Sequence, residues 1–194
     1  ASAAASPGAP AYVALTMHRE KLDANPQRPA TGARVGVLGT GAIGSVIARR
    51  FAAMGFVTRG FTRTPREIDD VEMFAGAARL ADFAAGLDIV VSVMPLTPQT
   101  TGLMNAEFFD LLADGAFIIN GGRGPQIIDD DLLAALDSGR LGGAALDVFA
   151  VEPLPAEHRF WTHPNVRVWP HVAAQTNAES AAQQVSAAIL KIIA

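Results

Sequence analysis

Three glycines near residue 40 have the spacing of a phosphate-binding turn. Gly39, Gly41 and Gly44 stand in the order G-x-G-x-x-G within the stretch GVLGTGAIG. Gly39 would allow a tight turn, Gly41 would let the backbone approach a pyrophosphate, and Gly44 would let a helix pack closely on the preceding strand. The free N–H groups that begin this helix, at Ala42 and Ile43, would then face the phosphates. A purely structural turn is the alternative, but an apolar strand before the motif and a helix after it favour a dinucleotide site.

The segment GFTRTPR, about 20 residues further on, bears on which dinucleotide would bind. In NAD sites an Asp or Glu at the end of the second strand holds the ribose 2′-hydroxyl. Here Thr62 stands in that place, Arg63 and Thr64 follow it, and Arg66 is close behind. A carboxylate would repel a 2′-phosphate, whereas Thr62 and the two arginines could hold one through charge-assisted hydrogen bonds. We therefore expect NADP (NADPH), with NAD as the alternative if the arginines are solvated loop residues.

The elements that would position these residues alternate between strands and helices. Continuous apolar runs predict buried strands, and helical periodicity predicts the segments between them. The predicted strands span 33–39, 56–62, 87–95, 115–120, 141–149 and 165–170, and the predicted helices span 42–54, 105–112, 129–140 and 177–193. Strands separated by helices favour an α/β fold with a doubly wound parallel sheet. The helix 42–54 has four apolar residues on one side, namely Ile43, Val46, Ile47 and Phe51.

Composition excludes several functional classes. The 194 residues, half of them hydrophobic, suffice for one domain with a sizeable core. The absence of Cys excludes disulfides and cysteine metal sites and suits a cytoplasmic protein. The net charge of -4, without a basic stripe, argues against nucleic acid, and the apolar runs are shorter than a membrane span needs. No His and carboxylate cluster has the spacing of metal ligands, so we expect no metal.

Six stretches of the chain carry a resemblance to a known family. They are GVLGTGAIG, FTRTPR, VMPLTPQTTGLMN, INGGRG, LLAALDSGRLGGAALDVFAVEPLP and HPNVRVWPHVAAQT. Together they resemble the D-isomer-specific 2-hydroxyacid dehydrogenases, and within them the glyoxylate/hydroxypyruvate reductase A branch. The resemblance implies a Rossmann-type NAD(P)-binding domain at 31–176, with a linker and interlobe helix at 1–30 and a C-terminal helix at 177–194. It also implies that the family's catalytic partner domain is largely missing from this chain.

The same resemblance gives catalytic roles to three residues. Arg123 matches the arginine that would grip the carboxylate of a 2-oxo acid with two hydrogen bonds. His171 matches the acid/base that would protonate the carbonyl oxygen as hydride arrives, and Glu152 matches the acid that would stabilise its imidazolium. The alternatives are a surface arginine, a structural histidine and a surface acid. Gly121 and Gly122 depart from the family's commoner ARG, where bulkier residues precede the arginine.

Two later segments would contact the cofactor if the resemblance holds. Pro95, Leu96 and Thr97 would line the adenosine or nicotinamide path. Asp147 would accept a hydrogen bond from the nicotinamide carboxamide. A structural hydrogen bond is the alternative for Asp147, because an Asp inside an apolar strand needs a partner.

The activity that the resemblance implies is NADPH-dependent reduction of a small 2-oxo acid, glyoxylate or hydroxypyruvate, by hydride transfer. One alternative is an NAD-dependent dehydrogenase of another D-2-hydroxy acid. The other is a non-enzymatic, nucleotide-sensing interaction protein of the co-repressor type. The stretch YVALTMHREKL (12–22) resembles the family's interlobe helix, which commonly packs in dimers. We therefore expect a homodimer, with an ordinary surface helix as the alternative.

Overall fold

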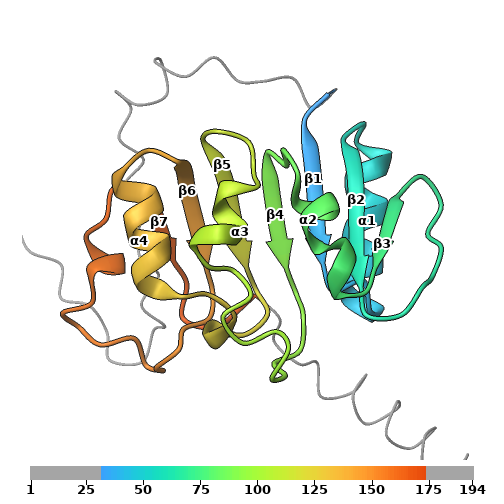
Figure 1. Ribbon diagram of the computed structural model, residues 1–194. Coiled ribbons are helices and arrows are strands. Elements are labelled where there is room, and N and C mark those ends of the chain that lie inside the picture. Colours follow the sequence, from blue (N-terminus) through green and yellow to red (C-terminus); the bar gives the residue numbers. More distant parts are fainter. Residues whose placement is uncertain (1–31, 174–194) are drawn as a thin grey trace, which may run out of the picture.

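Seven strands form the sheet on which the fold is built (Figure 1). The computed structural model describes residues 32–173. The strands are β1 Arg34–Leu38, β2 Val57–Thr62, β3 Glu72–Ala75, β4 Ile89–Ser92, β5 Ala116–Asn120, β6 Leu141–Leu146 and β7 Val166–Val168. All neighbours are parallel, in the order β3-β2-β1-β4-β5-β6-β7, so the direction of winding reverses between β1 and β4. This topology confirms the predicted α/β fold with a doubly wound parallel sheet.

All six predicted strands are shorter in the structure, two of them because they end early in loops, and the sequence does not predict one further strand. The ranges 87–95 and 141–149 shrink to β4 and β6, because their last residues leave the sheet and enter loops at its carboxyl edge. Pro95 and Asp147 therefore lie in loops rather than inside strands. The sequence does not predict β3, since EMFA is four residues long and follows an acidic stretch without an apolar run.

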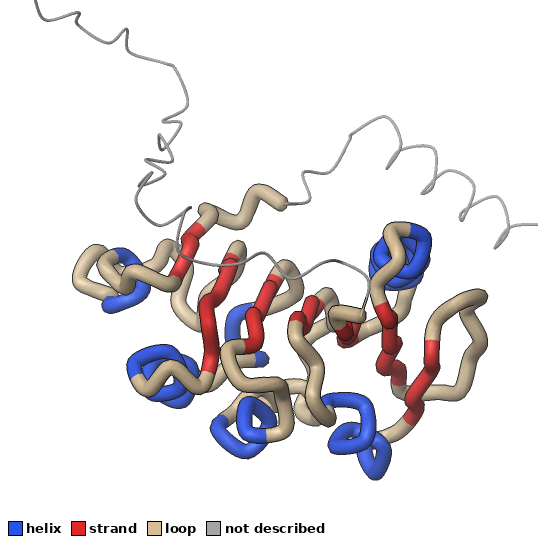
Figure 2. Tube along the Cα trace, turned by 90° about the horizontal axis from the view of Figure 1, so that it is seen from above, coloured by secondary structure: helices blue, strands red, loops and turns tan. Residues whose placement is uncertain are grey.

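The helices cover the two faces of the sheet unequally (Figures 1 and 2). Helix α1 (Ala42–Ala53) lies on one face, and α2 (Leu80–Ala84), α3 (Ala106–Asp110) and α4 (Asp129–Asp137) lie on the other. The predicted helices 105–112 and 129–140 are thus confirmed in shorter form as α3 and α4. Short 3₁₀ turns are η2 (Ala77–Arg79), η3 (Gly124–Gln126) and η4 (Arg159–Trp161). The predicted helices 12–22 and 177–193 lie outside the described residues.

Helix α1 packs on the sheet through its small residues rather than its large apolar ones. Gly44 and Ala48 are its buried residues, whereas the side chains of Ile43 and Val46 are 60% and 48% exposed. A Cβ added to Gly44 would lie 1.9 Å from the carbonyl oxygen of Gly39, so the helix approaches the turn too closely for any side chain. Of the four apolar residues that the sequence pattern places on one side, Ile47 and Phe51 are therefore partly buried, whereas Ile43 and Val46 point away from the sheet.

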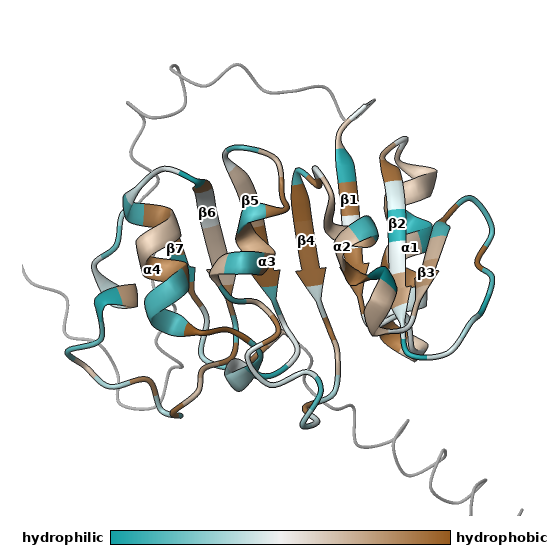
Figure 3. Ribbon diagram, in the orientation of Figure 1, coloured by the Kyte–Doolittle hydropathy of each residue, from teal (hydrophilic) through white to brown (hydrophobic). Residues whose placement is uncertain are grey.

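The core lies within the sheet and beneath α2, α3 and α4. Its largest fully buried side chains include Phe83, Phe109 and Phe160. Figure 3 shows the hydrophobic colour most evenly along β4. Several buried polar residues instead gather where strands end, namely Ser92, Asn120, Gln126 and Asp147. None of the helices within residues 32–173 is long and apolar enough to span a membrane.

Candidate active site

The glycine turn lies between β1 and α1, beside the point where the strand order reverses. The N–H groups of Gly39 and Thr40 donate to the carbonyl of Phe61, at 3.0 and 3.3 Å, and so fix the turn to the end of β2. Gly39 has a φ of 91°, and a Cβ added there would lie 2.9 Å from the Cα of Met94, so both conformation and contact require glycine. The turn also contacts the loop after β4 at this point.

The start of α1 suits an anionic group. A Cβ added to Gly41 would meet no atom within 4 Å, so open space lies in front of the turn. The helix has no side-chain cap and no acidic residue in its first turn. Its first N–H groups and the positive end of its dipole are therefore available to a phosphate. The residues present fit the pyrophosphate of a dinucleotide.

Basic residues follow β2 at the same edge. Thr62 ends the strand half-buried, and Arg63, Thr64 and Arg66 are exposed in the loop after it. The guanidinium of Arg66 donates to the carbonyl of Thr40, so this arginine lies against the glycine turn. Arg63 has no hydrogen bond or ion pair with any residue between 32 and 173. The edge therefore presents two cations, and no carboxylate ends β2, which fits a 2′-phosphate better than a free 2′-hydroxyl.

Glu152 and His171 form the side-chain pair that the sequence predicts. The Oε2 atom of Glu152 lies 2.8 Å from the Nδ1 atom of His171, and its Oε1 atom accepts a hydrogen bond of 2.9 Å from the N–H of Phe149. The hydrogen bond from His171 lowers the pKa of Glu152 most, the Phe149 bond adds to this effect, and the charge of Arg123 contributes less. Because Glu152 engages Nδ1, the opposite ring nitrogen, Nε2, is left for proton exchange with a substrate.

The backbone that carries His171 has an uncommon conformation. Its φ is 55°, in the left-handed region that residues other than glycine rarely adopt. Asp147 holds the next two residues, since its carboxylate accepts hydrogen bonds from the N–H groups of Val172 at 2.8 Å and Ala173 at 3.0 Å. Asp147 is 7% exposed. The structure thus gives Asp147 the structural hydrogen bonds that stood as its alternative, and its contact with a nicotinamide stays a prediction.

Arg123 lies in the loop after β5, next to the loop that carries Glu152. Asn120 shapes this loop by accepting from the N–H of Gly122 at 3.1 Å and donating to the carbonyl of Arg123 at 3.2 Å. A Cβ added to Gly124 would lie 1.8 Å from the backbone of Phe149, so the two loops touch where Gly124 stands. The structure therefore brings Arg123, Glu152 and His171 to one edge of the sheet from three separate loops.

The loop after β4 completes this edge. Thr100 folds it, because its hydroxyl accepts from the N–H of Thr97 at 2.8 Å and donates to the carbonyl of Pro95 at 2.9 Å. Leu96 projects from the loop and is 44% exposed. All three predicted contact residues of this loop, Pro95, Leu96 and Thr97, follow Met94, the residue that packs against Gly39 of the glycine turn.

Sequence reasoning missed the two buried amides that hold these loops, Asn120 and Gln126. Each is at most 1% exposed. Asn120 ends an apolar strand, and Gln126 stands between Pro125 and Ile127 in an apolar stretch. A polar side chain in such surroundings needs partners, and this was the available signal.

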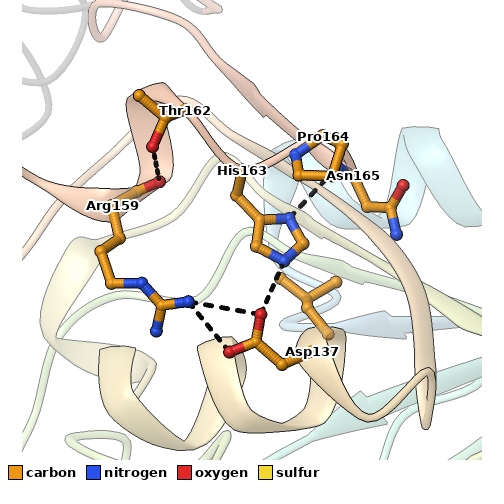
Figure 4. A pocket seen from close by; sticks show the side chains of 7 residues that line it. Asp137, Arg159, Thr162, His163, Pro164 and Asn165 are labelled. Carbon is orange, nitrogen blue, oxygen red and sulfur yellow. Dashed lines mark hydrogen bonds and ion pairs between the residues drawn. The ribbon is translucent and has the colours of Figure 1, made fainter.

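A separate pocket of about 360 Å³ lies elsewhere, where α4 ends and β7 begins (Figure 4). There Asp137 accepts hydrogen bonds of 3.0 and 3.3 Å from Arg159 and lies 3.4 Å from the Nε2 atom of His163. The hydrogen bond from Arg159 is the main cause that lowers the pKa of Asp137. This pocket is at the amino end of β7, away from the loops described above, and its charges are already paired.

Residues 32–173 hold no group of three or more His or carboxylate side chains that could bind a metal ion.

Comparisons with known proteins identify close similarities over most of the chain. Residues 11–173 match the profile of the D-isomer specific 2-hydroxyacid dehydrogenase, NAD binding domain. The chain is 44% identical over 158 residues to glyoxylate/hydroxypyruvate reductase A of Serratia proteamaculans, covering 81% of this chain and 50% of that protein. The chain thus spans about half the length of the curated relatives it matches.

Two solved structures show the same similarity in three dimensions. One is a D-isomer specific 2-hydroxyacid dehydrogenase from Xanthobacter autotrophicus Py2 in complex with NADPH and MES, with a TM-score of 0.82, 45% identity, and coverage of 87% of this chain and 69% of that one. The other is an NADPH-dependent glyoxylate/hydroxypyruvate reductase from Sinorhizobium meliloti in complex with NADP and sulfate. It has a TM-score of 0.82, 42% identity, and coverage of 87% and 54%.

Proposed function

The chain belongs to the D-isomer specific 2-hydroxyacid dehydrogenase family, and from this premise we propose that its protein reduces a small 2-oxo acid, glyoxylate or hydroxypyruvate, with NADPH. The observation that carries the proposal is that Arg123, Glu152 and His171 lie in three loops at the carboxyl edge of the sheet, the same edge at which the glycine turn follows β1. The curated relatives named glyoxylate/hydroxypyruvate reductase A support the choice of substrates.

In the proposed reaction each residue of this trio has one task. The guanidinium of Arg123 holds the substrate carboxylate and so orients the carbonyl carbon. Bound NADPH supplies the hydride to that carbon. The Nε2–H of His171 donates a proton to the carbonyl oxygen, and the bond from Nδ1 to Glu152 holds the ring and stabilises its positive charge. The product is the 2-hydroxy acid, and the reverse reaction returns the proton to His171.

The preference for NADPH rests on the end of β2. Arg63 and Arg66 are exposed there, Arg66 lies against the glycine turn, and Thr62 replaces the usual acid. The 2′-phosphate would bind between these groups, with the pyrophosphate at the start of α1. The two structural relatives that contain NADPH or NADP support this assignment.

The test is NADPH oxidation by the full-length protein with each acid. We expect Arg123→Gln to lower kcat/KM about 100-fold, since losing two charge-assisted hydrogen bonds costs roughly 3 kcal/mol. Arg159→Gln, in the separate pocket, is the matched control and should change kcat/KM less than twofold. A wild type that binds NADPH but reduces neither acid would contradict the proposed function and favour a nucleotide-sensing role.

Two further parts of the proposal concern the protein as a whole. We expect the 194-residue chain alone to bind NADPH but to reduce glyoxylate poorly, because its matched residues correspond to only about half the length of its curated relatives. Calorimetry and a turnover assay on this chain test that expectation.

We also propose a cytoplasmic homodimer, for which sedimentation of the full-length protein is the measurement.

A further inference from the structure

The side chain of Gln126 uses its whole hydrogen-bonding capacity in the interior of the protein. It is 0% exposed. Its Oε1 atom accepts from the hydroxyl of Ser92 at 3.1 Å and from the N–H of Arg123 at 3.2 Å. Its Nε2 atom donates to the carbonyls of Met94 at 3.0 Å and Pro95 at 3.1 Å. The amide orientation is fixed, because a backbone N–H must face the oxygen and two carbonyls must face the NH₂ group.

These bonds connect two loops of the candidate active site that are distant in sequence. Met94 and Pro95 belong to the loop after β4, and Arg123 belongs to the loop after β5, both at the lower edge of the sheet in Figure 1. The backbone of Arg123 is then held on both sides of its Cα. Gln126 accepts from its N–H, and Asn120 donates to its carbonyl.

Gly122 fits this arrangement and explains why the loop departs from the commoner ARG. A Cβ added at Gly122 would lie 2.7 Å from the Oε1 atom of Gln126 and 3.0 Å from the carbonyl oxygen of Met94. The first of these distances is shorter than a Cβ tolerates, so an alanine would push the Gln126 amide away. The side-chain amide of Gln126 therefore packs directly against Gly122, and the absence of a Cβ there leaves room for it between the two loops.

We propose that Gln126 is a positioning residue that keeps the substrate-binding Arg123 in register with the cofactor loop 94–97. This inference rests on the proposed function, since it takes Arg123 as the carboxylate ligand. Gln126 lies inside the loop after β5 with no exposed surface, so it acts through Arg123 and not by touching the substrate. Because its four hydrogen bonds connect the two loops, neither loop can move without displacing the other.

The first test follows hydrogen exchange in the full-length protein without cofactor. Methionine has a buried side chain of similar length that makes no hydrogen bonds. In Gln126→Met we expect the amides of two peptides, covering 93–101 and 119–127, both to exchange at least tenfold faster than in the wild type. Leu141→Val is the matched control, because Leu141 is buried at the start of β6, at the opposite edge of the sheet from the two loops. It should lower the melting temperature without this paired change.

The second test separates positioning from a general loss of stability by kinetics. Gln126→Met should raise the KM for glyoxylate about tenfold or more while the Kd for NADPH changes less than threefold, and Leu141→Val should change neither. Gln126→Glu should recover part of the wild-type KM as the pH falls from about 8 to 6, because burial favours the neutral acid, which can again donate to a loop carbonyl. Each value is compared with the wild type at the same pH.

The outcomes distinguish this proposal from the proposed function. A Gln126→Met protein with unchanged exchange in either loop, or with an unchanged KM, overturns the positioning role even if the wild type is an active reductase. If the wild type reduces neither acid, the proposed function fails, and the exchange experiment alone decides whether Gln126 couples the two loops.

Discussion

Replacing Asp147 with asparagine would test how the structure holds His171, the proposed proton donor. The carboxylate of Asp147 accepts from the N–H groups of Val172 and Ala173, directly after His171. An asparagine has almost the same shape but only one oxygen. Its NH₂ group would face one of the two N–H donors, so one hydrogen bond is lost and a donor meets a donor. We expect the segment after His171 to lose its fixed position.

The magnitude follows from these contacts. A hydrogen bond to a charged group contributes about 1.5–3 kcal/mol. Because Val172 and Ala173 are exposed, water can satisfy the freed N–H, so the segment should open more easily by about 1.5–3 kcal/mol, which corresponds to roughly 10- to 150-fold faster exchange of the amides at Val172 and Ala173. Because His171 would then spend less time in its left-handed conformation beside Glu152, kcat should fall more than the affinity for NADPH.

The assay is residue-resolved hydrogen exchange together with turnover in the full-length protein. Asp131→Asn is the matched control, because Asp131 also accepts from a backbone N–H, that of Ala106, but lies on α4 away from the site. It should leave exchange at Val172 and Ala173 unchanged. Equal protection of these amides in Asp147→Asn and wild type would refute the reasoning that Asp147 positions the histidine segment.

Three other predictions follow from the same edge of the sheet. Arg63→Asp combined with Arg66→Ala should weaken NADPH binding much more than NADH binding in parallel titrations, and an equal loss would contradict the 2′-phosphate assignment. His171→Ala should lower turnover by about 10²–10⁴-fold with nearly intact NADPH binding, so near-normal turnover between pH 6 and 8 would exclude it as proton donor. The pKa of Glu152 lies below its ordinary value of 4.5, so its charged form should stabilise the protein fully above about pH 5 and lose this effect on acidification. The difference in unfolding free energy between wild type and Glu152→Gln should therefore narrow toward pH 3. A difference that stays constant with pH would argue against the ion pair.

The sequence predicts the parallel sheet well, because long apolar runs separated by helical segments leave few other folds. It predicts the position of helix α1, but less well which of its residues contact the sheet. Periodicity places Ile43, Val46, Ile47 and Phe51 on one side, and of these only Ile47 and Phe51 are partly buried. The fully buried residues are Gly44 and Ala48, since small residues permit the closest approach. Strand β3 escapes prediction because its short segment is too polar at its start to show an apolar run.

The candidate site is predictable where a motif carries the chemistry and not where side chains hold the loops. The pairing of Glu152 with His171 is predicted and confirmed at 2.8 Å. The four bonds of Gln126 and the double acceptance by Asp147 depend on distances between segments that are far apart in the chain. No local pattern around either residue encodes those distances, so they required the structure.

The reversal of strand order between β1 and β4 has a consequence for the order of events during folding. Arg34 starts β1, and Asp88, 54 residues later, directly precedes β4. The N–H of Arg34 donates to the carboxylate of Asp88, and the N–H of Asp88 donates to the carbonyl of Arg34. Such a distant pairing must overcome the entropy of closing the chain between them, so it forms late. The glycine turn and the loop after β4 become neighbours only at that stage. We therefore expect a dinucleotide to slow unfolding of the finished protein while leaving the rate of folding nearly unchanged.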